Sequence, residues 1–186
     1  TVESISGFDP AFADDRSEAF AKEVYTDVDQ IRHLHHRANS PSLADGAGLS
    51  LIANKQTADE LDLEPRARIR SWANASVEPV VMLTACEAAA ERAIDQAGMT
   101  LDDIDLFEIN EAFAAIAVKF QRDQDVDPER FNVNGGIISM GHAMGATGQM
   151  LLATVIDELE RRDLETGLVA ISGGAGLGSA SVVERV

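Results

Sequence analysis

A single histidine stands in a glycine-rich stretch of the chain. His142 lies in residues 134–148, which contain five glycines and lead into a long amphipathic pattern at 145–162. Glycine lets a backbone approach a ligand closely, and the first turn of a helix offers free N–H groups to a developing negative charge. This setting favours a catalytic histidine; a surface histidine and a metal ligand are the alternatives. Because no carboxylates accompany it at a matched spacing, we expect no metal site.

A second polar segment directly follows an apolar one. Asn110-Glu111-Ala112-Phe113 comes after residues 104–109, which we expect to form a strand. Sites in α/β proteins are usually built where strands end. Asn110 is therefore a candidate site residue, but asparagine is also a common N-cap of a following helix. The residues alone leave both interpretations open.

A third segment combines a hydroxyl group with a glycine-rich turn. Residues 172–178 begin with Ser172 and contain four glycines, directly after the apolar run 168–171. Such a turn can direct several backbone N–H groups at one point, as an oxyanion hole does. It can equally be a tight hairpin that needs positive φ angles. These two interpretations also stay open.

Strands and helices alternate around these segments. This alternation predicts an α/β fold with a mixed, mainly parallel sheet covered by helices on both faces. The last two strands are joined by the short glycine-rich turn, so we expect them to be antiparallel. The predicted strands are 46–53 (buried), 66–73, 104–109, 132–134, 168–172 and 179–186, and the predicted helices are 55–61, 86–97, 111–121 and 145–162.

Composition limits the classes of partner. The 186 residues carry a net charge of −17, which disfavours nucleic acids and anionic membranes. The one cysteine, Cys86, excludes an internal disulfide and a cysteine-rich metal site. Residues 1–43 are polar and read as a linker or as the tail of a loop domain, and residues 44–186 as the folded domain. Because the chain begins at Thr1 rather than Met, we expect a processed or trimmed product.

The three segments, in this order and spacing, resemble the C-terminal half of the thiolase family. Residues 110–113 match its Asn-Glu-Ala-Phe motif, residues 135–148 its Gly-Gly and Gly-His loop, and residues 172–178 its closing Cys-Gly turn. The resemblance covers roughly residues 38–186. It implies a thiolase-like C-terminal domain, with coenzyme A thioesters as substrates and no cofactor.

The resemblance also implies roles for individual residues. His142 activates a nucleophilic cysteine of the N-terminal half, and Asn110 holds a water in the same oxyanion hole. Position 172 is the acid/base that moves the α-proton, and Gly174 lends an N–H to a second oxyanion hole. Residues that match substrate-contacting positions are Ser40, Ser42, Met82, Phe113 and Gly141.

Several positions depart from the family pattern. The half that carries the nucleophile is absent, and the acid/base cysteine is Ser172. A thiol titrates near 8.5, whereas a hydroxyl is scarcely ionised near neutrality and is poorly suited to reversible proton transfer. The proline after the histidine is Ala143, and Pro41 occupies a usual serine position. Cys86 is either a substitute nucleophile or, as we favour, a small buried residue.

Two functions follow as expectations. The first is an acyl-CoA acyltransferase of thiolase type, in which this chain supplies half of the active site for thiolysis or condensation of 3-ketoacyl-CoA in lipid metabolism. The second is a non-catalytic thiolase-like subunit that binds a partner or acyl-CoA. Both predict a cytoplasmic oligomer that contains an N-terminal thiolase half or a separate thiolase subunit. The alternating Arg66, Arg68 and Arg70 either meet coenzyme A phosphates or, as we favour, lie on a solvated face.

Overall fold

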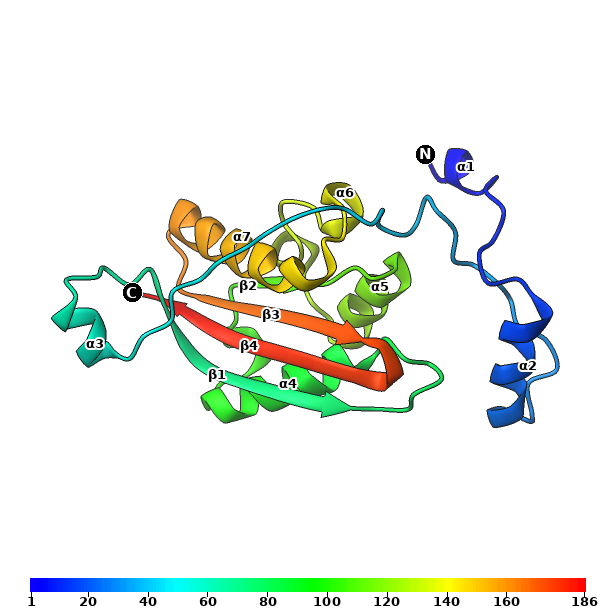
Figure 1. Ribbon diagram of the computed structural model, residues 1–186, viewed down its shortest axis with the longest axis horizontal. Coiled ribbons are helices and arrows are strands. Elements are labelled where there is room, and N and C mark those ends of the chain that lie inside the picture. Colours follow the sequence, from blue (N-terminus) through cyan, green and yellow to red (C-terminus); the bar gives the residue numbers. More distant parts are fainter.

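The computed structural model describes residues 1–186 and contains one four-stranded sheet with helices on both faces (Figure 1). The strands lie in the order β1-β4-β3-β2. No helix is long and apolar enough to cross a membrane. The strands are β1 (Ala67–Ser76), β2 (Leu106–Ile109), β3 (Thr166–Gly173) and β4 (Leu177–Arg185). The helices are α1 (Val2–Ile5), α2 (Asp15–Val24), α3 (Lys55–Glu60), α4 (Ala85–Ala97), α5 (Ala114–Asp123), α6 (Ile137–Met140) and α7 (Thr147–Arg162).

The sheet is mixed, but the prediction that it is mainly parallel is wrong. Only β2 and β3 are parallel, while β3–β4 and β1–β4 are antiparallel. The hairpin between β3 and β4 reverses the chain through the short turn Gly174–Gly176, as predicted for the last two strands. β4 therefore separates β1 from the parallel pair.

Two predicted strands do not form. Residues 46–53 are predicted to be a short buried strand, yet Leu49 is 97% exposed and the segment has no strand pairing. An apolar run is ambiguous between a buried strand and a segment that needs a partner from outside the chain. Residues 132–134 also form no strand, because the only strand-like pairing of this region with β2 is one isolated bridge between Phe131 and Phe107.

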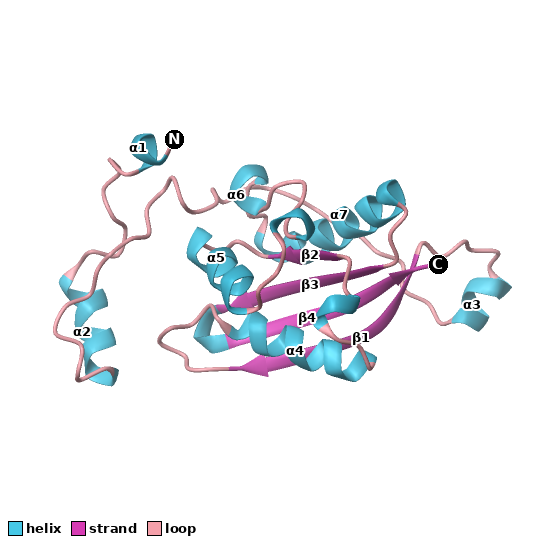
Figure 2. Cartoon of the chain, turned by 180° about the vertical axis from the view of Figure 1, so that it is seen from behind, coloured by secondary structure: helices cyan, strands magenta, loops and turns pink.

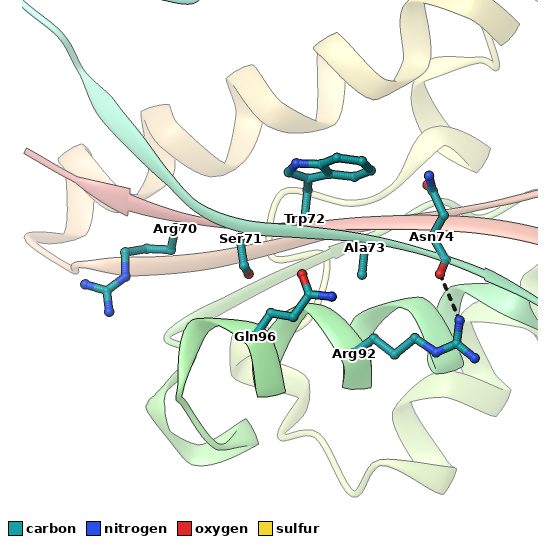
Figure 3. Close-up of a pocket in the computed structure, with 7 residues that line it drawn as sticks. All are labelled: Arg70, Ser71, Trp72, Ala73, Asn74, Arg92 and Gln96. Carbon is teal, nitrogen blue, oxygen red and sulfur yellow. Dashed lines mark hydrogen bonds between the residues drawn. The ribbon is translucent and has the colours of Figure 1, made fainter. Parts of the chain in front are cut away.

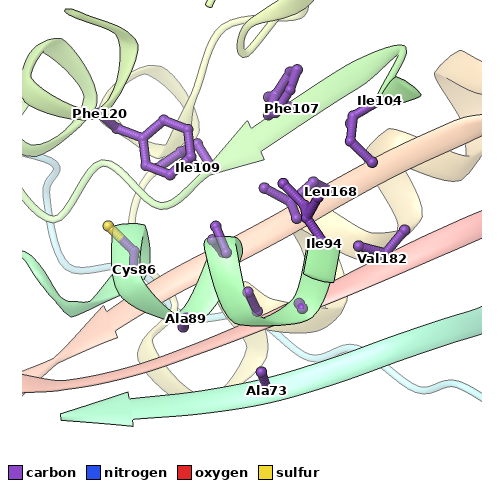
Figure 4. Close-up of a cluster of buried hydrophobic side chains, with 14 of the residues drawn as sticks. Ala73, Cys86, Ala89, Ile94, Ile104, Phe107, Ile109, Phe120, Leu168 and Val182 are labelled. Atoms are coloured by element: carbon purple, nitrogen blue, oxygen red, sulfur yellow. The ribbon is translucent and has the colours of Figure 1, made fainter. Parts of the chain in front are cut away.

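The larger hydrophobic core lies between the sheet and α4, with α5 at its end (Figure 4). Phe107 and Ile109 of β2, Leu168 of β3 and Val182 of β4 point to this side. Small alanine side chains let α4 pack closely against the sheet, and α4 ends at Gly98 with φ +70°, as predicted.

The opposite face of the sheet is covered by α7. Leu106 of β2 and Val169 of β3 pack there against Leu151, Val155 and Leu159. Successive strand residues point to opposite faces, so Leu106 and Phe107 belong to different cores. Figure 2 shows β2 and β3 side by side beneath α7. Helices on both faces were predicted correctly.

The N-terminal third contributes nothing to either core. No residue before Ala58 is buried, although α1 and α2 form within the stretch predicted to be irregular. Asp14 caps α2 by accepting the N–H groups of Arg16 and Ser17. The boundary predicted at residue 44 stays a prediction.

Candidate active site

The carboxyl ends of β2 and β3 bring two of the three motifs together. The two strands are parallel neighbours with Ile109 opposite Ala170. The Asn110 N–H donates to the Ala170 carbonyl at 2.9 Å. Asn110 and Ser172 therefore extend from the same edge of the sheet, where α/β proteins place their sites.

Asn110 does not cap a helix. α5 begins at Ala114, and its N-cap is Phe113, which makes no side-chain capping bond. Asn110 is only 1% exposed, and its Oδ1 atom is buried without a hydrogen-bond partner. The N-cap interpretation is therefore wrong, and the amide group is held at the end of β2 for another reason.

Glu111 connects this motif to the glycine-rich loop of His142. Its Oε2 atom accepts the Ile138 N–H at 3.0 Å. A Cβ atom at Gly136 would lie 2.1 Å from this carboxylate, so a larger residue there would have to displace the Glu111 side chain. Asn132 fixes the same region, because its side chain accepts the Ile109 N–H at 2.8 Å and donates to the Ile109 carbonyl at 3.1 Å.

His142 lies just before α7 and is half-buried. Its Nδ1 atom is 2.8 Å from the Thr147 hydroxyl, and Nε2 makes no hydrogen bond within the chain. Burial lowers the pKa of the imidazole, which favours the neutral form. A neutral histidine held at one ring nitrogen leaves the other nitrogen available for proton transfer.

The loop around His142 is anchored to an N-terminal segment. The His142 N–H donates to the Ser42 carbonyl at 2.8 Å, and the Ala44 N–H donates to the His142 carbonyl at 3.2 Å. Gly141 has φ +94°, and a Cβ atom there would lie 2.8 Å from the Ala44 Cβ. The predicted substrate residues Ser42 and Gly141 therefore lie next to His142.

The other predicted substrate residues are more dispersed. The Ser40 hydroxyl donates to the His36 carbonyl at 2.9 Å and is used locally. The Phe113 ring lies 4.5 Å from the His35 ring, between centroids, and so contacts the N-terminal segment. Met82 is near the closing turn, with its sulfur 3.9 Å from where a Gly174 Cβ would stand.

Ser172 caps α4 from across the fold. Its Oγ atom accepts the Cys86 N–H at 2.9 Å, while the N-cap residue Thr84 makes no side-chain capping bond. The Cys86 thiol is buried as well. Burial raises the pKa of this thiol, and the neighbouring Ser172 hydroxyl opposes that shift. A buried, protonated thiol fits the favoured interpretation of Cys86 as a core residue rather than a nucleophile.

The closing turn is a tight hairpin. Gly176 has φ +73°, and a Cβ atom there would lie 2.4 Å from the Val77 carbonyl oxygen. Ala175 also has a positive φ of 59°. The turn therefore packs closely on residues 77–85, while at Gly174 the nearest atom to an added Cβ is the Met82 sulfur, at an ordinary contact distance of 3.9 Å. The hairpin interpretation is correct, and it does not exclude an N–H group of Gly174 from a site.

A separate hollow lies on β1 and α4, away from the motifs (Figure 3). It is lined by Arg70, Trp72 and Arg92 among others, and the Arg92 guanidinium donates to the Asn74 carbonyl at 3.0 Å. No group of three or more His, Cys, Asp or Glu side chains is placed to hold a metal ion. No residue of the three motifs lines this hollow.

The arginine stripe is paired with carboxylates. Arg66 binds Asp157 and Glu160, both at 2.6 Å. Arg68 and Arg70 both bind Glu184. These exposed ion pairs fit the favoured interpretation of a solvated face, because the positive charges are already neutralised beside the sheet.

Comparison with known proteins decides the family. The model of the thiolase C-terminal domain matches residues 63–185. The chain belongs to the thiolase family. An acetyl-CoA acetyltransferase of Cupriavidus necator is 40% identical over 185 residues, which cover 100% of this chain and 43% of the relative. A 3-ketoacyl-CoA thiolase of Bacillus subtilis is 42% identical over 146 residues, 78% of this chain and 37% of the relative.

The thiolase fold is confirmed by a solved structure. The crystal structure of the Bacillus anthracis acetyl-CoA acetyltransferase matches with a TM-score of 0.83 and 31% identity, over 100% of this chain and 43% of that chain. The chain thus spans less than half the length of these relatives.

Three site features of this thiolase half were not predicted from its sequence. Thr147 orients His142, and a threonine five residues after the histidine was the available signal. Glu111 ties two motifs together, but its partner Ile138 is 27 residues away. The contact between Cys86 and Ser172 spans 86 residues and has no local signature.

Proposed function

We propose that this chain supplies the C-terminal half of the active site of a thiolase-type acyltransferase. Its substrates are coenzyme A thioesters, and the reaction interconverts a 3-ketoacyl-CoA plus coenzyme A with two shorter acyl-CoAs. The observation that carries the proposal is the arrangement of His142, which Thr147 holds at Nδ1 and which leaves Nε2 free. The names of the relatives, acetyl-CoA acetyltransferase and 3-ketoacyl-CoA thiolase, support it.

In this proposal His142 is the base for a cysteine of the N-terminal half. The free Nε2 takes the thiol proton, and the thiolate attacks the thioester carbonyl. The protonated imidazole and the start of α7 then favour negative charge on the carbonyl oxygen. Asn110 contributes its amide at the adjacent strand end, and Gly174 offers an N–H for a second carbonyl.

Ser172 makes this half-site poorly suited to forming or breaking the carbon–carbon bond in condensation and thiolysis. The pKa of a hydroxyl group lies far above neutral pH, so this group is poorly suited to reversible proton transfer. Its Oγ atom also already accepts the Cys86 N–H. We therefore expect slow condensation and thiolysis. Acyl transfer to coenzyme A, or thioester hydrolysis, uses His142 and Asn110 and is less affected.

The remaining residues of the site come from an N-terminal thiolase half. That half belongs either to the same polypeptide or to a separate subunit, since this chain covers 43% of its relative in Cupriavidus necator. The exposed apolar side chains of Leu49, Leu51 and Ile52 favour such a partner and an oligomeric protein. Residues 1–43 then serve as the tail of the loop domain. We expect the protein in the cytoplasm, as mouse and rat relatives are named cytosolic, and we expect no cofactor.

A non-catalytic subunit is the second candidate. The role of Ser172 as a cap of α4 favours it, because a residue at the acid/base position then has a purely structural task. In this second candidate, Ser40 and Ser42 are not needed to bind a substrate.

Binding of coenzyme A thioesters is a requirement of the catalytic candidate, whereas a non-catalytic subunit can lack it. The protein carrying both halves is titrated with acetyl-CoA in a calorimeter, as wild type and as Gly141→Val. The catalytic proposal predicts binding that the valine weakens at least about tenfold, because the side chain would collide with Ala44 beside His142. Absence of any acetyl-CoA binding would favour the scaffold.

A further inference from the structure

Two buried oxygen atoms near the site lack a partner. Glu108 Oε2 and Asn110 Oδ1 are the buried side-chain oxygen atoms that make no hydrogen bond. Each residue is 1% exposed. An unpaired buried polar atom costs about 1–3 kcal/mol, so two in one small region call for a physical reason.

The two side chains lie on the same face of β2. Residues two apart on a strand point to the same side, and Leu106, two residues before Glu108, packs under α7. Glu108 and Asn110 therefore both face the α7 side of the sheet, in line along the strand. The Asn110 amide is at the end of this line, where the site begins.

As the two oxygen atoms are placed, a proton on Glu108 would pair both of them. An ionised carboxylate and an amide oxygen are both acceptors and cannot bind each other. A protonated carboxyl group has one O–H donor. A single proton on Glu108 would therefore satisfy both oxygens, directly or through one bridging water.

The surrounding charges favour that proton. Glu111, in the following loop, and Glu158, on α7, both disfavour a negative charge on Glu108. The positive charges nearby are committed elsewhere, because Arg161 and Arg162 both bind Glu158. Burial, then Glu111 and Glu158, raise the pKa of Glu108 to about 8.

The neutral groups around Glu108 are also committed. The Asn134 amide donates to Glu158 at 3.0 Å. The Asn132 amide donates to the Ile109 carbonyl at 3.1 Å. Val169, opposite Glu108 on β3, is apolar. These two amide groups are thus used in hydrogen bonds to other residues.

We propose that Glu108 is a positioning residue whose protonated carboxyl group donates to Asn110 Oδ1 and so turns the Asn110 Nδ2 atom toward the substrate. The inference rests on the proposed function only in assigning Asn110 to the site. The bond fixes which end of the amide faces a thioester oxygen. Loss of the proton leaves two acceptors facing each other and releases the amide.

Infrared spectroscopy tests the proton directly, without any need for activity. The protein carrying both halves is titrated from pH 6 to pH 10, as wild type, Glu108→Gln and Glu64→Gln; Glu64 is an exposed control. The expected result is a protonated-carboxyl C=O band that persists at neutral pH, disappears with a midpoint near 8 and is absent only in Glu108→Gln. A carboxyl band missing at pH 7 in the wild type would overturn the proposal.

A second variant tests the bond to Asn110. A hydrogen bond donated by the neutral acid favours that form, so Asn110→Ala should shift the Glu108 band and lower its midpoint. An unchanged band and midpoint would show that the two groups do not interact and would also overturn the proposal. These outcomes hold whether or not the protein catalyses acyl transfer.

Kinetics then connect the bond to the site. In an active protein, acyl transfer should have an alkaline limb near pH 8 in the wild type. Glu108→Gln, which keeps an N–H donor, should lose this limb and keep kcat within a few-fold. Glu108→Leu should lower kcat about tenfold or more with little change in KM. A leucine variant with full kcat would contradict the positioning role.

Discussion

The Ser172 Oγ atom on β3 accepts the backbone N–H of Cys86 in the first turn of α4, at 2.9 Å. The serine thus performs the capping role that Thr84, the N-cap residue, leaves open. The position that we propose as the acid/base is therefore tied to a helix end. Its hydroxyl has a structural partner whatever chemistry the site performs.

Removal of this hydroxyl should destabilise the protein. Ser172→Ala leaves the Cys86 N–H without a partner at a buried helix end, and we expect a loss of about 1–2 kcal/mol in the free energy of unfolding. Denaturant unfolding measures it, with Ser179→Ala as the control because Ser179 is exposed and makes no side-chain hydrogen bond. Equal stability of the two variants would show that the capping bond contributes nothing.

Restoration of the thiol should restore carbon–carbon chemistry. Ser172→Cys places a group with a pKa near 8.5 at the acid/base position, and we expect thiolysis of a 3-ketoacyl-CoA to rise at least about tenfold. The same variant in a Cys86→Ser background excludes a disulfide between the two neighbours. Unchanged thiolysis in both backgrounds would remove position 172 from the acid/base role.

The contact with Thr147 should orient the His142 imidazole for proton transfer and so raise kcat. Thr147→Val keeps the shape of the buried side chain but removes the partner of Nδ1. We expect kcat for acyl transfer to fall about tenfold to a hundredfold. Thr154→Val on the same helix is the control, since its hydroxyl binds only the Met150 carbonyl. Equal rates for the two variants would argue against an orienting role.

Burial of His142 should shift the acid limb of the acyl-transfer rate to lower pH. Its pKa is lowered from the ordinary 6.5, so the imidazole stays neutral to lower pH. The acid limb of the acyl-transfer rate should therefore lie below pH 6.5 and be displaced in Thr147→Val. A pH–rate profile of both proteins measures it, and an acid limb above 6.5 would contradict the burial argument.

Glu108 should make stability fall as pH rises. Its pKa is raised from 4.5 to about 8 in the folded protein, so between these values the folded state holds a proton that the unfolded state has released. The free energy of unfolding should then decrease by up to about 1.4 kcal/mol per pH unit in this window. Glu108→Gln should lack this slope. Parallel pH dependence of both proteins would show that Glu108 is ionised when folded.

Local patterns predict much of this fold, but among the strand directions they predict only the antiparallel pairing of the last two strands. The alanine-rich pattern and Gly98 predict α4, and the alternation at 66–73 predicts β1. Leu49 and its neighbours look like a buried strand, because an apolar run does not reveal whether its partner lies in the same chain. Two of the three strand pairings, β1–β4 and β3–β4, are antiparallel.

The candidate site was predictable at the level of motifs. Glycine-rich turns and strand ends indicate His142, Asn110 and Ser172 because backbone geometry limits which residues fit there. The bonds of Ser172 to Cys86 and of Glu111 to Ile138 join residues far apart in the chain, and only the folded topology brings them together.

The most direct test of the central claim is the rate of acyl transfer from acetyl-CoA in the protein carrying both halves, compared between His142→Ala and His33→Ala. His33 contacts only Glu18 on α2, far from the motifs in sequence. The account predicts a loss of at least about a hundredfold for His142→Ala and a nearly unchanged rate for His33→Ala. Full activity without the His142 imidazole, or no acyl transfer in the wild type, would contradict it.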